Sequence, residues 1–287
     1  MDNEIYGYGN SYTTEFRQND PRLGRWLSAD PLENRFPWQS PYVSMDNTPT
    51  FLIDPKGSST HTDSSGNVIA VYNDEDMSVF KHKTLPKEFA RTTNETKTVD
   101  GKKIKLPVLK GGEKMGETEY WDEFADLETK TPVGRIMFSD DPKFSWHPLI
   151  DWGQTYANYQ DLTLTMQDSK LNEILDMKHN SGWAPYGPMT GRMLNGKYAT
   201  ARSAGNYLAG MNGVTGTVQG RRISGETYMK LAGAYQLKKL SAPNIAKILL
   251  LGTSFGPAPY YGEQEYSGRR ILEGIRAGEE YLKRMKK

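Results

Sequence analysis

The sequence predicts an α+β fold that begins with strands and turns and ends in helices. Through residues 1–57, turn-forming residues recur about every eight to twelve positions between short aromatic and aliphatic runs. From about residue 147, apolar residues take up the spacing of helices instead. The chain is therefore expected to contain a small β- and turn-rich segment at 1–57, a β-hairpin and linker region at 58–146, and a mainly α-helical domain at 147–287.

Composition limits the function classes that this fold can serve. The 287 residues include no cysteine, which excludes disulfide frameworks, thiol nucleophiles and cysteine-ligated zinc or iron–sulfur sites. No apolar run approaches the roughly 18 residues that a membrane-spanning helix needs. We therefore expect no membrane span.

Charge is unevenly distributed, although 36 basic and 35 acidic residues nearly cancel over the whole chain. The segments 1–57 and 58–146 each have a net charge of −3. Residues 147–287 contain eighteen basic and eleven acidic residues, a net charge of +7. Such an asymmetry indicates either an anionic partner for the basic part or solvated helix faces rich in lysine and arginine.

Two strands are expected soon after the first segment. A polar turn at 63–67 precedes two alternating runs, 68–72 and 77–82. We expect these runs to pair with each other as a β-hairpin across the acidic turn at 73–76.

The rest of the linker region has weaker signals. Residues 84–118 are expected to form a loop, hairpin or linker, and their lysines at 102–105 fit either a solvated loop or a nucleic-acid patch. The acidic stretch 117–128 is expected to form a short helix, with its apolar residues on one face.

Five helices are expected in the C-terminal domain. Their signals are apolar residues at helical spacing, Ser224 as an N-cap, Pro243 in a first turn and Gly252 at an end. The expected spans are about 162–178, 196–211, a helix that begins after Ser224, 244–251 and 266–285. An irregular loop rich in glycine, proline and aromatic residues separates the last two.

The first segment contains several spaced motifs in a fixed order. They are Tyr8-Gly-Asn, Asn19-Asp-Pro-Arg-Leu-Gly-Arg-Trp, Asp30-Pro-Leu, Ser40-Pro-Tyr and Asp54-Pro-Lys-Gly. Over about residues 6–57 this order resembles the end of the Rhs/YD-repeat core, in which Asp-Pro-x-Gly marks the end of a shell around a variable C-terminal toxin. The resemblance implies the detachable end of a longer secreted toxin, carried by the Rhs shell or a secretion apparatus.

Small residues recur every four positions in the second expected helix, at Ala201, Gly205, Ala209 and Gly213. A glycine costs about 1 kcal/mol of helix stability relative to alanine, so two of them need a reason. Close packing of another helix and close approach of a ligand both supply one. Helical geometry puts Lys197 and Arg202 away from the bare face and Asn206 beside it, where it can hydrogen-bond a ligand.

The loop before the last helix combines stiff and reactive residues. Two prolines precede a pair of tyrosines that ends at Tyr261, and two carboxylates, Glu263 and Glu265, follow at the start of the helix. A carboxylate there acts as a general acid or base, or it complements the helix dipole. Arg269 lies close enough in sequence to hold a phosphate or an oxyanion.

Three stretches of the C-terminal domain carry a second resemblance. They are Arg202-Ser-Ala-Gly-Asn-Tyr-Leu-Ala-Gly-Met-Asn-Gly, Tyr228-Met-Lys-Leu-Ala-Gly-Ala-Tyr-Gln, and Tyr261-Gly-Glu with the later Gly268-Arg. Over about residues 146–280 they resemble the polymorphic toxin type 44 family of bacterial toxins. The resemblance implies a ribonuclease and places Arg202, Asn206 and Glu263 in the family's most distinctive stretches, which makes them the first candidates for catalysis.

Histidine is scarce, and His147 lies at the entry to the basic domain with Asp151 four positions on. A histidine–aspartate pair can serve as general base in RNA cleavage, or it can tie down a turn. His82 and His179 have no acidic or histidine neighbours at metal-ligand spacing. The common metal, nucleotide and nucleophilic-serine motifs do not occur, so no cofactor and no metal are expected.

The leading hypothesis is a secreted antibacterial toxin whose C-terminal domain is a metal-independent ribonuclease. The catalytic candidates are Glu263, His147, Arg202 and Asn206, and the substrate-binding candidates are Lys197, Arg269, Tyr261, Glu265 and Asp151. The net positive charge would attract the phosphates of RNA. By resemblance, the toxin is delivered into the cytoplasm of neighbouring bacteria and has a cognate immunity protein.

The alternative hypothesis is a hydrolase of peptidoglycan glycan strands that acts in the periplasm of target cells. Glu263 would then be the general acid, with Asp151, Asp161 or Glu226 as its partner. The tyrosines of the loop suit sugar stacking as well as they suit bases.

Overall fold

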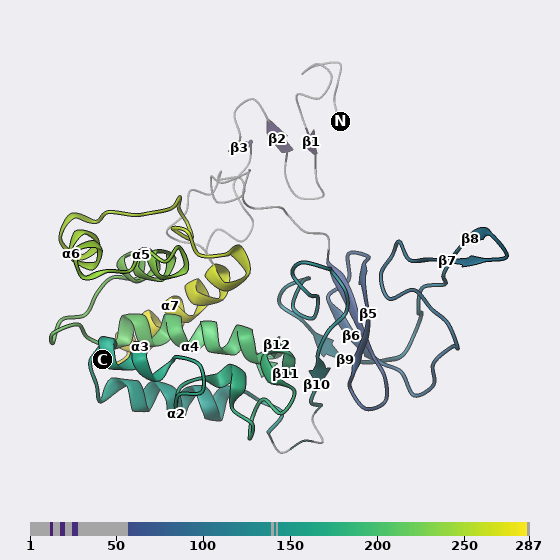
Figure 1. Cartoon of the computed structure of the whole chain (residues 1–287), viewed down its shortest axis with the longest axis horizontal. Helices are drawn as coiled ribbons and strands as arrows, with labels where there is room; N and C mark the ends of the chain where they lie inside the picture. Colours follow the sequence, from purple (N-terminus) through teal and green to yellow (C-terminus); the bar gives the residue numbers. More distant parts are fainter. Residues whose placement is uncertain are drawn as a thin grey trace. The chain divides into compact units, whose positions relative to one another are not determined.

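The computed structural model describes residues 12–13, 18–20, 25–27, 57–138, 141 and 143–285 (Figure 1). The chain divides into two units, Met1–Lys56 and Gly57–Lys287. Helices and sheets are both present, so the α+β prediction is confirmed.

The described residues of the first unit form a small antiparallel sheet. Its strands are β1 (Tyr12–Thr13), β2 (Gln18–Asp20) and β3 (Arg25–Trp26). The remaining motifs of this segment, including Asp54-Pro-Lys, lie outside the described residues.

The second unit begins with a four-stranded sheet in the order β5–β4–β6–β9. The strands are β4 (Ser58–Thr62), β5 (Val68–Asn73), β6 (Ser78–Lys81) and β9 (Glu113–Glu117). The polar turn between β4 and β5 is held by the Asp63 carboxylate, which accepts hydrogen bonds from the backbone N–H groups of Ser65 and Asn67. The turn predicted at 63–67 is therefore the connection of an antiparallel β4–β5 pair.

The predicted hairpin between the runs 68–72 and 77–82 is wrong in its pairing. Both runs contain strands, but β4 lies between them, antiparallel to β5 and parallel to β6. β4 escaped prediction because its sequence, Ser-Ser-Thr-His-Thr, is polar throughout, while all five residues are buried. A fully buried polar strand shows no apolar alternation.

The linker region also contains a two-stranded antiparallel ribbon, separate from the four-stranded sheet. β7 (Thr96–Val99) and β8 (Lys102–Lys105) pair across Asp100 and Gly101, which both have positive φ. All eight strand residues are exposed, and Figure 1 shows the ribbon standing clear of the four-stranded sheet. Of the loop, hairpin or linker expected within 84–118, the structure shows a hairpin.

The short helix predicted at 117–128 is wrong. After β9 the chain runs through turns, because adjacent residues are drawn to different partners. Phe124 packs in an apolar cluster with Val79 and Ile136, while the Glu123 carboxylate binds Arg270. Neighbouring residues of a helix lie only about 100° apart around its axis, so a helix would not direct these two side chains to opposite sides.

A three-stranded sheet joins strands from before and after the first two helices of this unit. It contains β10 (Arg135–Ile136), β11 (Thr190–Leu194) and β12 (Lys197–Thr200). The β11–β12 turn is Asn195-Gly196, with φ of 52° and 82°, as a two-residue hairpin requires. The predicted helix at 196–211 is therefore wrong at its start, since β12 occupies those residues and α4 begins at Ala201.

The helices are α2 (His147–Asn158), α3 (Leu162–Asp168), α4 (Ala201–Thr215), α5 (Gly225–Gln236), α6 (Ala242–Leu251) and α7 (Glu265–Met285), with 3₁₀ helices η3 (Met177–His179) and η4 (Gly187–Met189). The predictions for α5, α6 and α7 are confirmed, including the Ser224 cap and Gly252 in the left-handed conformation. The helix predicted at 162–178 ends at Asp168, and Asn172 has a φ of 65°, which a helix does not accommodate.

Helices α4 and α7 pack with their backbones in contact. A Cβ at Gly210 would lie 2.0 Å from the carbonyl oxygen of Ile271, and one at Gly274 would lie 1.9 Å from that of Tyr207. Tight packing of the two helices thus accounts for Gly210 and Gly274. Gly213, one of the small residues that recur every four positions, packs against Tyr228 of α5. Among the described residues, none of the helices is long and apolar enough to cross a membrane.

Candidate active site

The N-terminal turns of α4 meet the 3₁₀ helix η3. The Thr200 hydroxyl caps α4 by accepting a hydrogen bond from the backbone N–H of Ser203 at 3.2 Å. One turn on, a Cβ built at Gly205 would lie 3.6 Å from Cε of Lys178. The Lys178 side chain therefore lies against α4 at a position that has no side chain of its own.

Two side chains of α4 add unpaired donors beside Gly205. The guanidinium carbon of Arg202 lies 3.9 Å from the centroid of the Tyr266 ring, a cation–π contact. The Nε and Nη2 atoms of Arg202 and Nδ2 of Asn206 are buried and have no hydrogen-bond partner among the described residues. Because a buried unpaired donor costs about 1–3 kcal/mol, the group suits a ligand that brings acceptor oxygens.

Glu263 joins this group from the loop before α7. Burial raises the pKa of its carboxyl, and a backbone N–H and the Lys178 ammonium partly offset the shift. Burial lowers the pKa of Lys178; Asp176 and Glu263 oppose this shift, and Arg202 adds to it. These interactions couple Lys178, Arg202 and Glu263, and with Asn206 we name them the Lys178 cluster.

Three of the four catalytic candidates, Arg202, Asn206 and Glu263, thus belong to one cluster. Lys178 was missed, because it falls at the end of the expected helix 162–178 and no motif marks it. Around Lys178 lie the Glu263 carboxyl, whose pKa is raised by burial, and the Arg202 guanidinium, which has two buried donors without a partner, so the group suits a bound anion.

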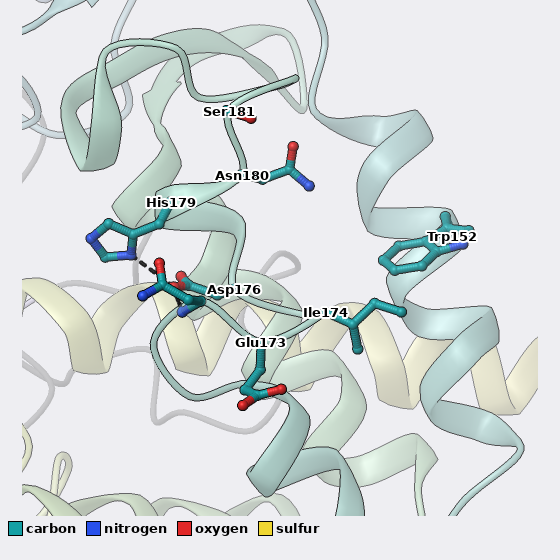
Figure 2. Close-up of a pocket in the computed structure, with 8 residues that line it drawn as sticks. Trp152, Glu173, Ile174, Asp176, His179, Asn180 and Ser181 are labelled. Carbon is teal, nitrogen blue, oxygen red and sulfur yellow. Dashed lines mark hydrogen bonds and ion pairs between the residues drawn. The ribbon is translucent and has the colours of Figure 1, made fainter.

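A pocket of about 540 Å³ is lined by residues on either side of Lys178 (Figure 2). Asp176 and His179 lie on one side of it, and Trp152 of α2 lies across from them. Trp152 and Ile174 are exposed and give the pocket an apolar wall. The other six lining residues are polar, so the pocket is mainly polar with one apolar side.

His147 lies outside the Lys178 cluster. It is the first residue of α2, and its Nε2 accepts a hydrogen bond from the backbone N–H of Asn195 at 3.3 Å. Asp151 is exposed one turn later, and no hydrogen bond or ion pair joins it to His147 in the part of the chain that the structure describes. The geometry corresponds to a histidine that ties down the β11–β12 turn.

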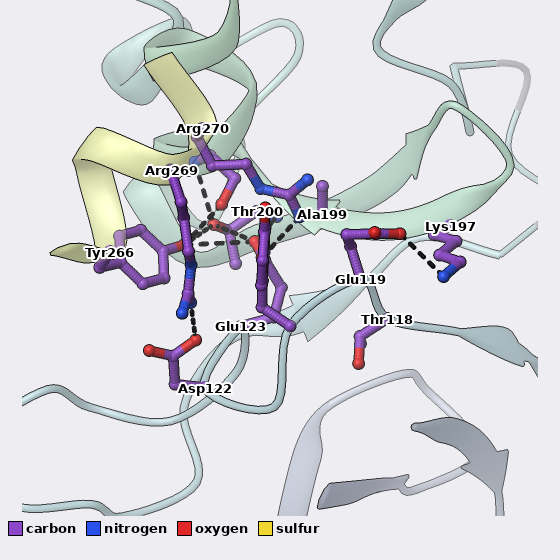
Figure 3. Close-up of polar contacts among 12 residues, drawn as sticks. Thr118, Glu119, Asp122, Glu123, Lys197, Ala199, Thr200, Tyr266, Arg269 and Arg270 are labelled. Carbon is purple, nitrogen blue, oxygen red and sulfur yellow. Dashed lines mark hydrogen bonds and ion pairs between the residues drawn. The ribbon is translucent and has the colours of Figure 1, made fainter. Parts of the chain in front are cut away.

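Arg269 and Lys197 are already paired with carboxylates (Figure 3). The Arg269 guanidinium binds Asp122 and stacks on the Tyr120 ring, with 3.8 Å from the guanidinium carbon to the ring centroid. Lys197 lies on β12, and its Nζ is 2.8 Å from a carboxylate oxygen of Glu119. A phosphate would have to compete with these carboxylates for both cations.

A buried network joins Glu123, the end of β12 and the first turns of α7 (Figure 3). Glu123 is fully buried and accepts hydrogen bonds from the backbone N–H of Thr200 at 2.6 Å and from Arg270 at 2.9 Å. Burial favours its protonated form, but Arg270 and the hydrogen bonds hold its pKa below the usual value. The Tyr266 hydroxyl bonds Glu123 and Ser203, which fixes the ring on which Arg202 stacks.

The two remaining binding candidates lie elsewhere. The Tyr261 hydroxyl donates to Glu226 at 3.2 Å, and Nζ of Lys230 lies 5.3 Å from the centroid of the Tyr261 ring. Glu265 is exposed as the first residue of α7, where a carboxylate complements the helix dipole.

Within the described residues, no group of three or more histidines and carboxylates is arranged to hold a metal ion. Comparison of the chain with protein-family models, with curated proteins and with solved structures finds no match.

Proposed function

We propose that the chain is a secreted antibacterial toxin of Rhs type whose helical part, residues 147–287, cleaves RNA without a bound metal. The observation that carries this proposal is the Lys178 cluster. It combines two cations, buried donors that lack partners, and one carboxyl group whose pKa is raised. The resemblances to the Rhs core and to type 44 toxins supply delivery and a cognate immunity protein as parts of the same proposal.

The donors of the cluster suit a phosphodiester group. Lys178 and Arg202 would neutralise the phosphate, and the unpaired Nε and Nη2 atoms of Arg202 form a fork that matches two phosphate oxygens. The Asn206 amide would add a third hydrogen bond. As charge develops on the phosphate in the transition state, these donors would stabilise it.

Glu263 is suited to proton transfer at that phosphate. Burial raises the pKa of its carboxyl, which favours the protonated form that a general acid needs. In RNA cleavage the leaving 5′-oxygen needs a proton, and Glu263 would supply it. The neighbouring Lys178 keeps this pKa from rising further.

The test is RNA cleavage by the full chain in EDTA. We expect wild-type protein to degrade total RNA, and Glu263→Gln to lower the rate by about 10²–10⁴-fold, the usual contribution of a general acid. Glu280→Gln is the matched control, because Glu280 is an exposed carboxylate of α7, the helix that follows Glu263 in the chain. Equal rates for the two variants would refute the role of Glu263, and an inactive wild type would refute the ribonuclease proposal.

Glycan-strand hydrolysis is the second candidate, supported by the raised pKa of Glu263 and by the exposed Trp152 as a surface for sugar stacking. It also needs a second carboxylate close to Glu263. Asp161 caps α3 by accepting from Thr163, and Glu226 pairs with Lys230. Expression in the cytosol and with a secretion signal separates the candidates, since a wall hydrolase kills only from the periplasm.

A further inference from the structure

Asp176 and His179 form a hydrogen-bonded pair in the wall of the pocket (Figure 2). Nδ1 of His179 lies 2.7 Å from Oδ2 of Asp176. The Asp176 side chain is 7% exposed and also accepts hydrogen bonds from the backbone N–H groups of Asn172 at 2.8 Å and Lys178 at 3.1 Å. The loop fixes the carboxylate, and the carboxylate in turn fixes the imidazole.

This hydrogen bond determines which imidazole nitrogen is free. A carboxylate accepts hydrogen bonds and donates none, so the proton of the neutral ring lies on Nδ1 and the lone pair on Nε2. The His179 side chain is 38% exposed, and no described residue hydrogen-bonds its Nε2. The ring is therefore oriented, accessible and able to accept a proton.

We propose that His179 is the general base of RNA cleavage and that Asp176 is its positioning residue, an inference that rests on the proposed function. His179 follows Lys178 directly in η3, so one short element supplies both a phosphate-binding cation and a base. His179 would take the role of general base, for which His147 was the candidate from the sequence.

The rest of the pocket fits a nucleotide. Trp152 is 41% exposed and Ile174 is 49% exposed, and both line the pocket. A nucleobase gains about 1–3 kcal/mol by stacking on an aromatic side chain.

The reaction is a transphosphorylation with two proton transfers. Nε2 of His179 takes the proton of the 2′-hydroxyl, and the 2′-oxygen forms a bond to the adjacent phosphorus. The bond between phosphorus and the 5′-oxygen breaks, and protonated Glu263 gives its proton to that oxygen. The products are a 2′,3′-cyclic phosphate and a 5′-hydroxyl end, and exchange with water restores neutral His179 and protonated Glu263.

The experiment measures cleavage of a single-stranded RNA by the full chain in EDTA over a range of pH. We expect His179→Gln to lower kcat/KM by about 10²–10⁴-fold. The same variant should lose the acid limb of the pH profile that a histidine base produces. In His179→Gly, added imidazole should restore part of the rate, a rescue that a merely structural histidine would not show.

Asp176→Asn tests the positioning role. An amide can donate to the ring and stabilise the wrong tautomer, so the rate should fall and the acid limb should move, while KM changes little. Thermal unfolding of each variant identifies any general loss of structure. The imidazole rescue of His179→Gly leaves Asp176 unchanged, so its result does not depend on how Asp176 contributes to folding.

The outcomes separate the two proposals. A wild type without RNA cleavage would overturn the ribonuclease and this inference with it. Cleavage that persists unchanged in His179→Gln, or a loss of the acid limb in His147→Gln instead, would overturn the inference alone. Lack of imidazole rescue in a folded His179→Gly variant would also contradict it.

Discussion

Glu123 remains ionised although its side chain is fully buried between β12 and α7. Four donors surround its carboxylate: the backbone N–H and hydroxyl of Thr200, the Tyr266 hydroxyl and the Arg270 guanidinium. Arg270 gains a second carboxylate from Glu273 at 2.8 Å. Thr200, which precedes α4, is thereby tied to the first turns of α7. Arg202 lies on α4 and Tyr266 on α7, so this link also holds Arg202 against the Tyr266 ring.

The buried pair of Glu123 and Arg270 should be far more important for stability than an exposed pair nearby. Glu123→Gln leaves the Arg270 charge buried without a full counterion, so we expect the free energy of unfolding to fall by about 3 kcal/mol or more. Glu119→Gln breaks the half-exposed pair with Lys197 and should lower it by less than about 1 kcal/mol. Urea unfolding at pH 7 measures both, and similar losses would contradict this account.

At the scale of elements, β4 depends on a chain of buried polar groups. Ser59 donates to Asp74 at 2.6 Å, so its oxygen is free to accept from Nε2 of His61 at 3.1 Å. Nδ1 of His61 then accepts from Nε2 of His82 at 2.8 Å. Each group has one proton and one acceptor in the right place, which makes a buried polar strand possible.

This series of hydrogen bonds requires a neutral His61, and the free energy of unfolding should therefore depend on pH. Burial, together with the neighbouring His82, lowers the pKa of His61 to about 4, while the unfolded side chain titrates near 6.5. Between these values the unfolded chain binds more protons, so stability is complete above about pH 6.5 and is lost as the pH falls toward 4. We expect His61 to contribute a loss on the order of 2 kcal/mol at pH 5.

Urea unfolding between pH 7.5 and pH 4.5 measures this effect. In His61→Gln the free energy of unfolding should depend less steeply on pH in that window, whatever its value at pH 7.5. An unchanged slope would show that His61 does not control the acid sensitivity of β4.

Elements with local signals were predictable, and elements with tertiary causes were not. Ser224, Pro243 and Gly252 mark the ends of α5 and α6 through backbone chemistry that acts within one turn. β4 is polar and becomes a strand through partners on β5 and β6. The turns of the 118–126 segment are likewise determined by partners far along the chain.

At the scale of the whole molecule, the candidate site depends on contacts that a sequence does not display. Arg202 and Asn206 share α4 and were predictable together by resemblance. Lys178 packs against α4 from η3, and the charge of Glu263, in the loop before α7, acts on Lys178. Neither relation is visible in the sequence. His147, for which the sequence left a general base and a turn contact open, lies outside this group and contacts the β11–β12 turn.

The net charge of the helical part leads to a prediction about salt. If residues 147–287, with their net charge of +7, bind single-stranded RNA through phosphates, each contact contributes about −0.7 to the slope of log K against log salt. For about three to five contacts we expect a slope between about −2 and −4, measured by fluorescence anisotropy of labelled RNA with the full-length Glu263→Gln variant.

Two added substitutions locate the charges that matter. In the Glu263→Gln background, Lys178→Gln should make the slope shallower by about 0.7, because it removes one phosphate contact. Lys103→Gln changes one exposed lysine of the β7–β8 ribbon and should leave the slope unchanged, as expected of a solvated hairpin. A change with Lys103→Gln but none with Lys178→Gln would show that RNA binds at the β7–β8 ribbon instead. A slope near zero for all variants would show that the protein does not bind RNA through its phosphates.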